Sequence, residues 1–211
     1  MSKYLRYAGI AASAVLIVFG VASMIIGANG RSTVRDNLAA EKIVGSDDMT
    51  PVAIAAAAKE AGLKNVAIPT CSVAGKAIDN GANARCFAEY MRIHALEASG
   101  GLVYSEMGQY LDASGKPTSD KTAAAIDPAT KKPVPNAARN TWVTETALST
   151  ALNTSYFAEN VALFSIVMGA ALLLTGIGFL VVTLGLLGTA ARKEDEVVSP
   201  PEPAATPAVA V

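Results

Sequence analysis

Residues 8–27 read AGIAASAVLIVFGVASMIIG, an uncharged apolar run close to the N-terminus. At a rise of 1.5 Å per residue, a helix of about 20 residues spans roughly 30 Å, the thickness of the hydrocarbon core of a bilayer. A second uncharged run covers residues 161–191 and ends at Arg192 and Lys193. We therefore predict two transmembrane helices, at residues 8–27 and 160–190, with the second tilted or extended past the bilayer.

The composition agrees with this prediction. Apolar residues make up 52% of the 211 residues and aromatic residues only 6%, so the hydrophobicity comes from Ala, Val, Leu and Ile, as in lipid-facing helices. The net charge of −1 gives no electrostatic reason to expect a nucleic acid partner. The partners we expect are the lipid bilayer and other membrane proteins or further copies of the chain.

Basic residues flank the two apolar runs on the same side. Lys3 and Arg6 precede the first run, and Arg192 and Lys193 follow the second. Because positive residues favour the cytoplasmic side, we expect both termini to be cytoplasmic in the cell membrane and residues 28–159 to lie outside. The 13 Lys and Arg residues of that connecting segment do not oppose this orientation, because loops so long escape the rule.

The first apolar run has a second interpretation as a cleaved signal peptide, since it is N-terminal and follows basic residues. Its apolar stretch is longer than the usual 7–15 residues of such a peptide. Only a weak small-residue cleavage site follows it, at Ala28-Asn29-Gly30. We favour an uncleaved anchor.

Small residues recur at heptad spacing in both runs. Since seven residues are close to two helical turns, each set lies on one face of its helix and lets another backbone approach closely. We expect these faces to pack against a helix of the same chain or of a partner, although Gly is also frequent in membrane helices generally. The positions are Ser13, Gly20 and Gly27 in the first run, and Gly169 with Gly176 and Gly178 with Gly185 in the second.

The segment between the runs is expected to form a small, mostly helical domain. Thr50 can cap a helix that has Pro51 at its first position and stops at Gly62. Another amphipathic helix is predicted over residues 83–98, and a third from Ala138 into the second apolar run. The predicted fold is mainly α: a two-helix transmembrane hairpin with a small, mostly helical extracytoplasmic domain between the spans.

Two segments have compositions typical of disorder. Residues 112–137 are rich in Ala, Pro, Lys, Thr and Ser with almost no large apolar side chains, which predicts a flexible excursion. Residues 191–211 are acidic and then rich in Pro and Ala, which predicts a disordered cytoplasmic tail.

The chain has two cysteines, Cys71 and Cys86, both in the segment expected outside. Because that compartment is oxidising, a Cys71–Cys86 disulfide is the interpretation we favour. Closing a loop of about 15 residues stabilises a fold by roughly 3 kcal/mol in the chain-entropy model. Metal binding is the alternative, but two cysteines at this spacing with a single histidine make a poor ligand set.

Residues that carry chemistry are few. His94, the only histidine, lies on an apolar helical stripe, where a packed or interface residue is commoner than a catalyst. Asp47 and Asp48 precede a helix, and such carboxylates more often serve its cap and dipole than a cation. No G-x-S-x-G, phosphate-loop or HExxH motif is present. We therefore assign no catalytic, cofactor-binding or metal-binding residue and no cofactor, and expect a protein that is not an enzyme.

One run of residues indicates a family. His94 to Gly101 read HALEASGG, and Tyr104-Ser105-Glu106-Met107 follow. Together with Glu41-Lys42-Ile43 and Asp47-Asp48, this pattern resembles an uncharacterised family of actinobacterial two-span membrane proteins. The resemblance covers both spans and most of the segment between them, and implies a topology.

Members of that family often carry the label "aromatic ring-opening dioxygenase". A non-haem Fe(II) oxygenase of the facial-triad type needs two histidines and a carboxylate, and this chain has one histidine. The residues therefore argue against the label.

The leading hypothesis is a non-catalytic accessory or scaffold protein of the actinobacterial cell envelope, acting as a small subunit of a larger membrane complex. The alternative is an extracytoplasmic ligand-binding or sensory membrane protein whose acidic tail reports inward. An enzyme ranks below both.

Overall fold

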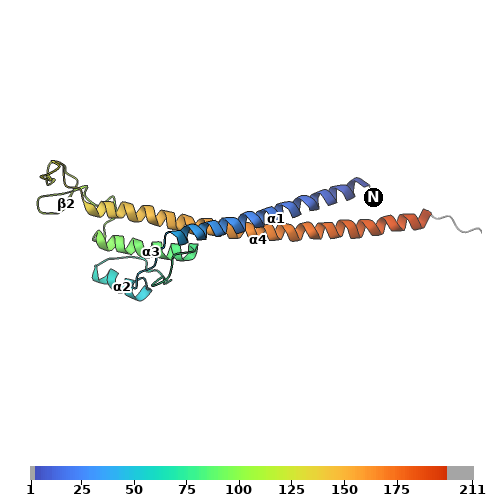
Figure 1. Cartoon of the computed structure of the whole chain (residues 1–211), viewed down its shortest axis with the longest axis horizontal. Helices are drawn as coiled ribbons and strands as arrows, with labels where there is room; N and C mark the ends of the chain where they lie inside the picture. Colours follow the sequence, from blue (N-terminus) through green and yellow to red (C-terminus); the bar gives the residue numbers. More distant parts are fainter. Residues whose placement is uncertain (1–2, 199–211) are drawn as a thin grey trace, which may run out of the picture. The chain divides into compact units, whose positions relative to one another are not determined.

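The computed structural model describes the backbone of residues 3–198 and the side chains of residues 4–185. This part of the chain is mainly helical, as predicted, with four α-helices and two short strands (Figure 1). The two longest helices are each long and apolar enough to cross a membrane. The elements are α1 (Lys3–Ala40), α2 (Pro51–Glu60), α3 (Gly81–Ala98), β1 (Tyr110–Leu111), β2 (Pro117–Thr118) and α4 (Ala137–Val198).

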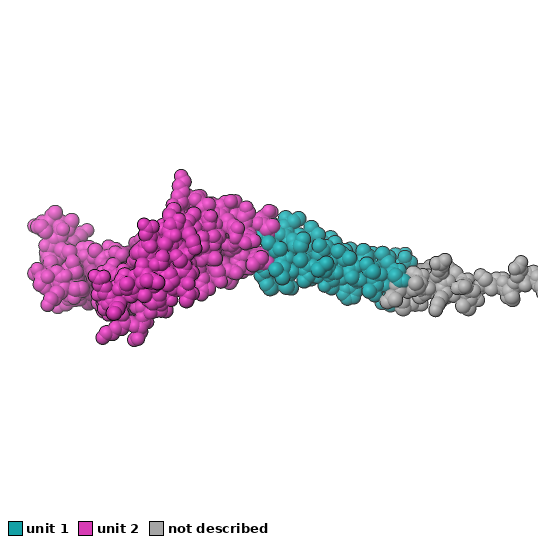
Figure 2. Space-filling model, turned by 90° about the horizontal axis from the view of Figure 1, so that it is seen from below, with its two compact units in different colours: residues 1–27, 164–211 teal, residues 28–163 magenta. Residues whose placement is uncertain are grey.

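The chain divides into two compact units (Figure 2). Unit 1 consists of residues 1–27 and 164–211, and unit 2 of residues 28–163. The helices α1 and α4 each contribute residues to both units.

In unit 1, α1 and α4 run antiparallel. Gly9 lies against Thr183, and Gly20 lies against Gly169 and Leu173, so higher numbers on one helix meet lower numbers on the other. Buried residues recur every seven positions on both helices, as expected for a pair that packs along a heptad repeat. They are Ser13, Gly20 and Gly27 on α1, and Gly169, Gly176 and Thr183 on α4.

The helix α4 ends later than the predicted second span. It continues past residue 190 to Val198, so the first residues of the predicted disordered tail are helical. The sequence from Ala191 to Glu196 consists of residues that favour or tolerate helix, and Pro200 disfavours helix at the residue before it. The remainder of that predicted tail, residues 199–211, lies outside the described residues.

In unit 2, the ends of the two short helices follow from local sequence. The Thr50 hydroxyl accepts a hydrogen bond from the Ala53 N–H at 3.2 Å and caps α2, as predicted. The helix α3 begins two residues earlier than expected because Asn80 caps it, accepting a hydrogen bond from the Asn83 N–H at 3.0 Å. It ends as predicted at Ser99-Gly100-Gly101, where both glycines have positive φ.

The core of unit 2 surrounds the inner face of α3. Tyr90 is fully buried, and its hydroxyl donates a hydrogen bond to the Cys71 carbonyl at 2.6 Å. Residues from all four helices and from the loop before α3 complete the core. The most deeply buried among them are Ile54, Val73, Ile78, Ala84 and Ile93, with Leu38 from α1 and Leu152 from α4 at its edges.

The predicted excursion at about residues 112–137 contains the strand β2, which pairs antiparallel with β1. Three aspartates start tight turns in it by accepting hydrogen bonds from backbone N–H groups two to four residues further on: Asp112, Asp120 and Asp127. Short polar side chains that bond their own backbone favour such turns over helix. Isolated β-bridges, among them Asp112 with Ala124 and Ile126 with Pro133, connect these turns. The flexibility of the segment stays a prediction.

Candidate functional site

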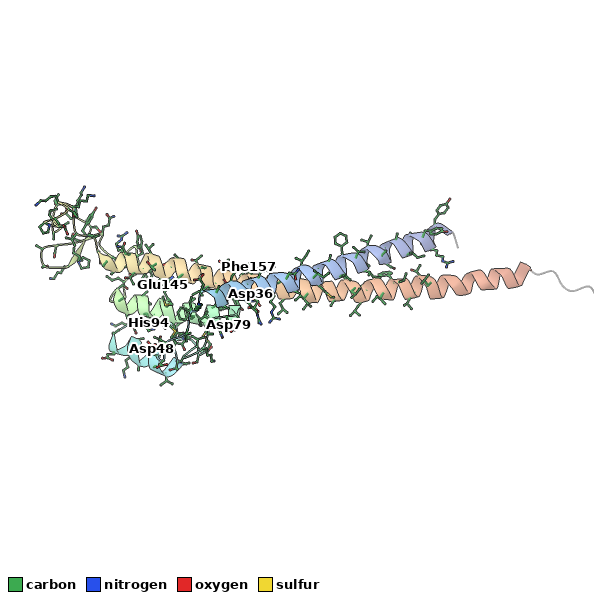
Figure 3. All side chains as sticks on the ribbon, viewed as in Figure 1. Asp36, Asp48, Asp79, His94, Glu145 and Phe157 are labelled. Atoms are coloured by element: carbon green, nitrogen blue, oxygen red, sulfur yellow. A yellow bond between two sulfur atoms is a disulfide. The ribbon has the colours of Figure 1, made fainter. Side chains whose placement is uncertain are left out.

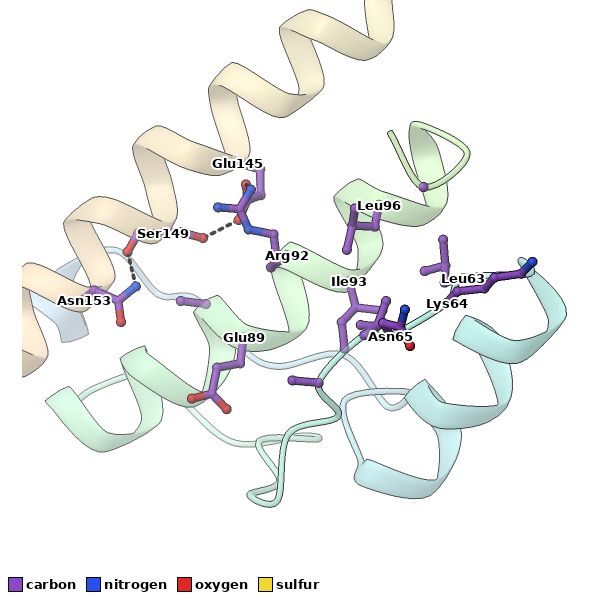
Figure 4. A pocket seen from close by; sticks show the side chains of 14 residues that line it. Leu63, Lys64, Asn65, Glu89, Arg92, Ile93, Leu96, Glu145, Ser149 and Asn153 are labelled. Carbon is purple, nitrogen blue, oxygen red and sulfur yellow. Dashed lines mark hydrogen bonds and ion pairs between the residues drawn. The ribbon is translucent and has the colours of Figure 1, made fainter. Parts of the chain in front are cut away.

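Unit 2 contains a pocket of about 480 Å³ beside α3 (Figure 4). One wall is apolar and comes from the segment after α2 and from α3. Polar groups come mainly from α3 and α4, and Lys64 and Asn65 add two from the segment after α2. The apolar lining includes Leu63, Val66, Ile93 and Leu96, and the polar lining consists of Lys64, Asn65, Glu89, Arg92, Glu145, Ser149 and Asn153.

Arg92 is the best-positioned charged group of this pocket. Its Nη1 atom lies 3.1 Å from Oε2 of Glu145, whose side chain is only 3% exposed. The Ser149 hydroxyl donates to the other oxygen of Glu145 at 2.7 Å, and the Arg92 guanidinium lies 4.6 Å from the centre of the Trp142 ring. These contacts hold the guanidinium at the pocket wall, where it can donate hydrogen bonds to a polar ligand.

His94 lies outside that pocket, close to Asp48 (Figure 3). It bridges two carboxylates. Its Nε2 atom is 3.3 Å from Asp48 of the loop before α2, and its Nδ1 atom is 3.1 Å from Glu97 of α3. Both ring nitrogens are thus engaged, and the contact ties that loop to α3. Among the described residues, no hydroxyl or thiol bonds to the ring as a nucleophile would.

Asp48, one of the two aspartates weighed as a cation ligand, therefore pairs with His94 and also accepts a hydrogen bond from the Ser46 hydroxyl. Asp47 is exposed. Within residues 4–185, no group of three or more His, Cys, Asp or Glu side chains is arranged to hold a metal ion.

A second polar centre lies around Glu159 and joins three helices. Its Oε1 atom accepts hydrogen bonds from Nε of Arg31 at 2.9 Å and from Nε of Arg35 at 2.7 Å. Its Oε2 atom accepts one from the Gly81 N–H at 2.6 Å, at the first position of α3. Gly81 fits there because a Cβ would lie 2.8 Å from the Tyr156 Cα and 2.9 Å from Oε2 of Glu159.

The surroundings of Glu159 favour its charged form. Burial raises the pKa of the carboxyl, but the hydrogen bonds from Gly81, Arg31 and Arg35 and the charge of Arg35 together outweigh burial and lower the pKa below its ordinary value. Negative charge beside the N-terminus of α3 also interacts favourably with the helix dipole. Glu159 therefore stays ionised at neutral pH and links α1, α3 and α4.

Cys71 and Cys86 form a disulfide, as predicted. It joins the loop before α3 to the second turn of α3 and closes a segment of 15 residues. The hydrogen bond from Tyr90 to the Cys71 carbonyl lies next to it and fixes the same loop.

The predicted helix-packing residues are placed in two groups. Gly20 and Gly169 lie backbone to backbone, and Gly176 lies against Ile17 and Leu16. Ser13 is fully buried and donates its hydroxyl proton to the Gly9 carbonyl at 2.8 Å, and Gly27 is buried as well. Gly178 and Gly185 are exposed, and a Cβ at either would meet no atom within 4 Å, so the structure does not bring them into this contact.

No protein-family model, curated protein or solved structure matches this chain. The resemblance to the actinobacterial two-span family therefore stays a prediction.

The Arg31, Arg35 and Glu159 cluster was not predicted from the sequence. The available signal was position: both arginines lie just after the first apolar run, and Glu159 lies just before the second. The Arg92 and Glu145 pair was missed because nothing in the local pattern of α3 or α4 indicates which charged residues meet.

Proposed function

We propose that this chain is a non-catalytic accessory or scaffold protein of the actinobacterial cell-envelope membrane and a small subunit of a larger membrane complex. The observation that carries the proposal is the exposure of its two apolar helices. Only 11% of the most apolar window of α1 and 17% of that of α4 is buried within the chain. Surfaces so apolar need lipid or other membrane helices around them.

In this proposal, residues 8–27 and 160–190 form a transmembrane hairpin, and residues 28–159 form a domain outside. The disulfide supports this orientation, because disulfides persist in oxidising compartments and are rare in the cytosol. Lys3, Arg6, Arg192 and Lys193 then all lie on the cytoplasmic side.

The arrangement of the polar groups supports a role without catalysis. The single histidine is held between two carboxylates, Arg92 is paired with Glu145, and Glu159 is saturated by three donors. Apart from the contact between His94 and Glu97, which lies within α3, these contacts join separate elements, which is what a scaffold requires.

The test is chemical cross-linking in intact membranes followed by purification of the tagged full chain in a mild detergent. We expect a reproducible species larger than the monomer that contains a second protein or a further copy of the chain. Cells that carry the tag alone give the background. A chain that is recovered only as a monomer, with no specific cross-link, contradicts the proposal.

The pocket beside α3 favours a second candidate, an extracytoplasmic ligand-binding or sensory protein. The pocket volume of about 480 Å³ lies within the range of small-molecule sites. The pocket combines apolar lining residues with fixed hydrogen-bond donors. Signalling would then pass to the tail after the second span. Deletion of residues 194–211 tests whether the tail carries a signal. An unchanged phenotype would contradict a signalling role.

A further inference from the structure

The cluster around Glu159 contains more positive than negative charge. Arg31 and Arg35 both donate their Nε to the same oxygen of Glu159, and the other oxygen is taken by the Gly81 N–H. One carboxylate thus serves two guanidinium groups, which leaves an excess of one positive charge. Among the described residues, no hydrogen bond occupies the terminal Nη amines of Arg31 or Arg35.

Arg31 and Arg35 line a cavity of about 200 Å³ within unit 2. The side chains of Arg31 and Arg35 are 40% and 45% exposed, so a ligand can reach them. Asn80 and Asn160 add polar groups to the lining, and Leu163 adds an apolar one. Tyr156 also lines the cavity, and Arg85, which pairs with Glu89, lies over its ring at 5.0 Å from the ring centre.

The chemistry of this cavity matches a phosphate group. A guanidinium presents a planar fork of N–H donors that binds phosphate oxygens in pairs, and its charge never titrates in the physiological range. The two forks lie four residues apart on α1, on neighbouring turns of one face. Two exposed aspartates lie near these residues in the sequence and each accepts a hydrogen bond from another side chain: Asp36, the residue after Arg35, accepts one from the Ser32 hydroxyl, and Asp79 accepts one from Asn80.

The position of the cluster along the chain indicates where that phosphate comes from. Arg31 is the fourth residue after the first apolar run, and Glu159 is the second residue before the other. If both runs span the membrane, as proposed above, the cluster lies at the level of the lipid headgroups. Basic clusters at that level attract the headgroups of anionic lipids by their charge.

We infer that Arg31 and Arg35 form a binding site for the phosphate of an anionic phospholipid in the leaflet that faces unit 2. Glu159 holds the two guanidinium groups in position, and their Nη amines bind the phosphate oxygens. The inference rests on the proposed membrane insertion.

The experiment is native mass spectrometry of the full chain, released from detergent micelles that contain equal amounts of phosphatidylglycerol and phosphatidylcholine. We expect at least a fivefold preference of the wild-type chain for phosphatidylglycerol. The variants Arg31→Gln and Arg35→Gln each leave one arginine to pair with Glu159, so the fold is retained while the excess charge is lost. Each should reduce the preference to near unity with the disulfide intact and the melting temperature within a few degrees of wild type.

The matched control is the double variant Lys121→Gln and Lys132→Gln, which removes two exposed positive charges on the segment between β1 and α4. It should retain the wild-type preference. Equal binding of both lipids by the wild-type chain, or a full preference in Arg31→Gln and Arg35→Gln, overturns the inference. Displacement of the bound lipid by millimolar inorganic phosphate assigns the site to a free anion and also overturns it.

Alkaline carbonate extraction of membranes separates this inference from the proposed function. A chain that stays in the membrane but shows no lipid preference contradicts only the phosphate site. A chain that carbonate releases contradicts the membrane insertion on which both depend.

Discussion

Gly20 of α1 and Gly169 of α4 approach each other so closely that neither position has room for a side chain. A Cβ on Gly20 would lie 2.8 Å from the Gly169 carbonyl oxygen, and a Cβ on Gly169 would lie 2.7 Å from the Gly20 carbonyl oxygen. Both carbonyl oxygens belong to the backbone, so rotation of a side chain cannot relieve these two overlaps. This contact fixes the separation of the two apolar helices in unit 1.

Replacing Gly20 with Leu should therefore force the helices apart. Overpacking of a close contact typically costs about 1–3 kcal/mol, and we expect a loss of that size in the free energy of unfolding. Titration of the detergent-solubilised chain with dodecyl sulfate, followed by circular dichroism, measures it. Gly178→Leu is the matched control, because a Cβ there meets no atom within 4 Å. Equal losses in both variants would contradict the role of the Gly20 contact.

Removal of the disulfide should destabilise unit 2 strongly. The double variant Cys71→Ser and Cys86→Ser frees a segment of 15 residues in the unfolded chain. We expect a loss of about 3 kcal/mol, as in the chain-entropy model for a loop of this length. Thermal unfolding of the purified chain gives the measurement. A reducing agent should lower the melting temperature of the wild-type chain and leave that of the double variant unchanged.

Glu159→Gln should weaken the junction of α1, α3 and α4. The change replaces charge-assisted hydrogen bonds from two arginines with neutral ones, for which we expect a loss of about 1–3 kcal/mol. Glu89→Gln is the control: Glu89 is 42% exposed and lies 3.4 Å from an exposed Arg85. Exposed ion pairs of that kind contribute only about 0–1 kcal/mol. Chemical denaturation should therefore show a larger loss of stability for Glu159→Gln than for Glu89→Gln. Equal losses would contradict the stabilising role of Glu159 at this junction.

The lowered pKa of Glu159 predicts a dependence of stability on pH. Because the folded chain holds this proton more weakly than the unfolded chain, stability rises with pH in the acid range. The contribution is fully present above the ordinary pKa of 4.5 and is lost as the pH falls through the lower folded value. Melting temperatures between pH 7 and pH 3 should fall less steeply for Glu159→Gln than for wild type.

Other carboxyl groups also make the stability depend on pH. The effect of Glu159 is therefore the difference between the pH profiles of wild type and Glu159→Gln. The pKa values of Asp112, Asp120 and Asp127 are also lowered, chiefly by hydrogen bonds from the residues that follow each of them. These aspartates are unchanged in Glu159→Gln and cancel between the two proteins. Parallel pH profiles for wild type and Glu159→Gln would show that Glu159 does not titrate as described.

Local sequence was sufficient to predict most of the helices and their ends. The Thr50 and Pro51 pair and the Ser99-Gly100-Gly101 stop act within a few residues, and the structure has them as expected. The disulfide also followed from sequence, because only one pairing of two cysteines is possible within the chain. These features and the two apolar runs were sufficient to predict the mainly α fold class.

Contacts between distant residues could not be predicted in this way. Glu159 meets Arg31, Arg35 and Gly81 across separations of 78 to 128 residues. Periodicity shows which face of a helix is apolar but not which charged residue of another helix it meets. The turns of the excursion at residues 112–137 were equally difficult to predict, because they depend on single aspartates rather than on a repeated pattern.

The proposed function and the proposed lipid site both require that the two apolar helices cross a membrane with unit 2 on the outer side. Labelling of intact cells with a membrane-impermeant maleimide tests this directly, using Ser119→Cys in the exposed segment after β2 and Ala205→Cys near the C-terminus. We predict that Cys introduced at position 119 is labelled in intact cells and that Cys introduced at position 205 is labelled only after permeabilisation. Labelling of position 205 but not of position 119 in intact cells would contradict the account.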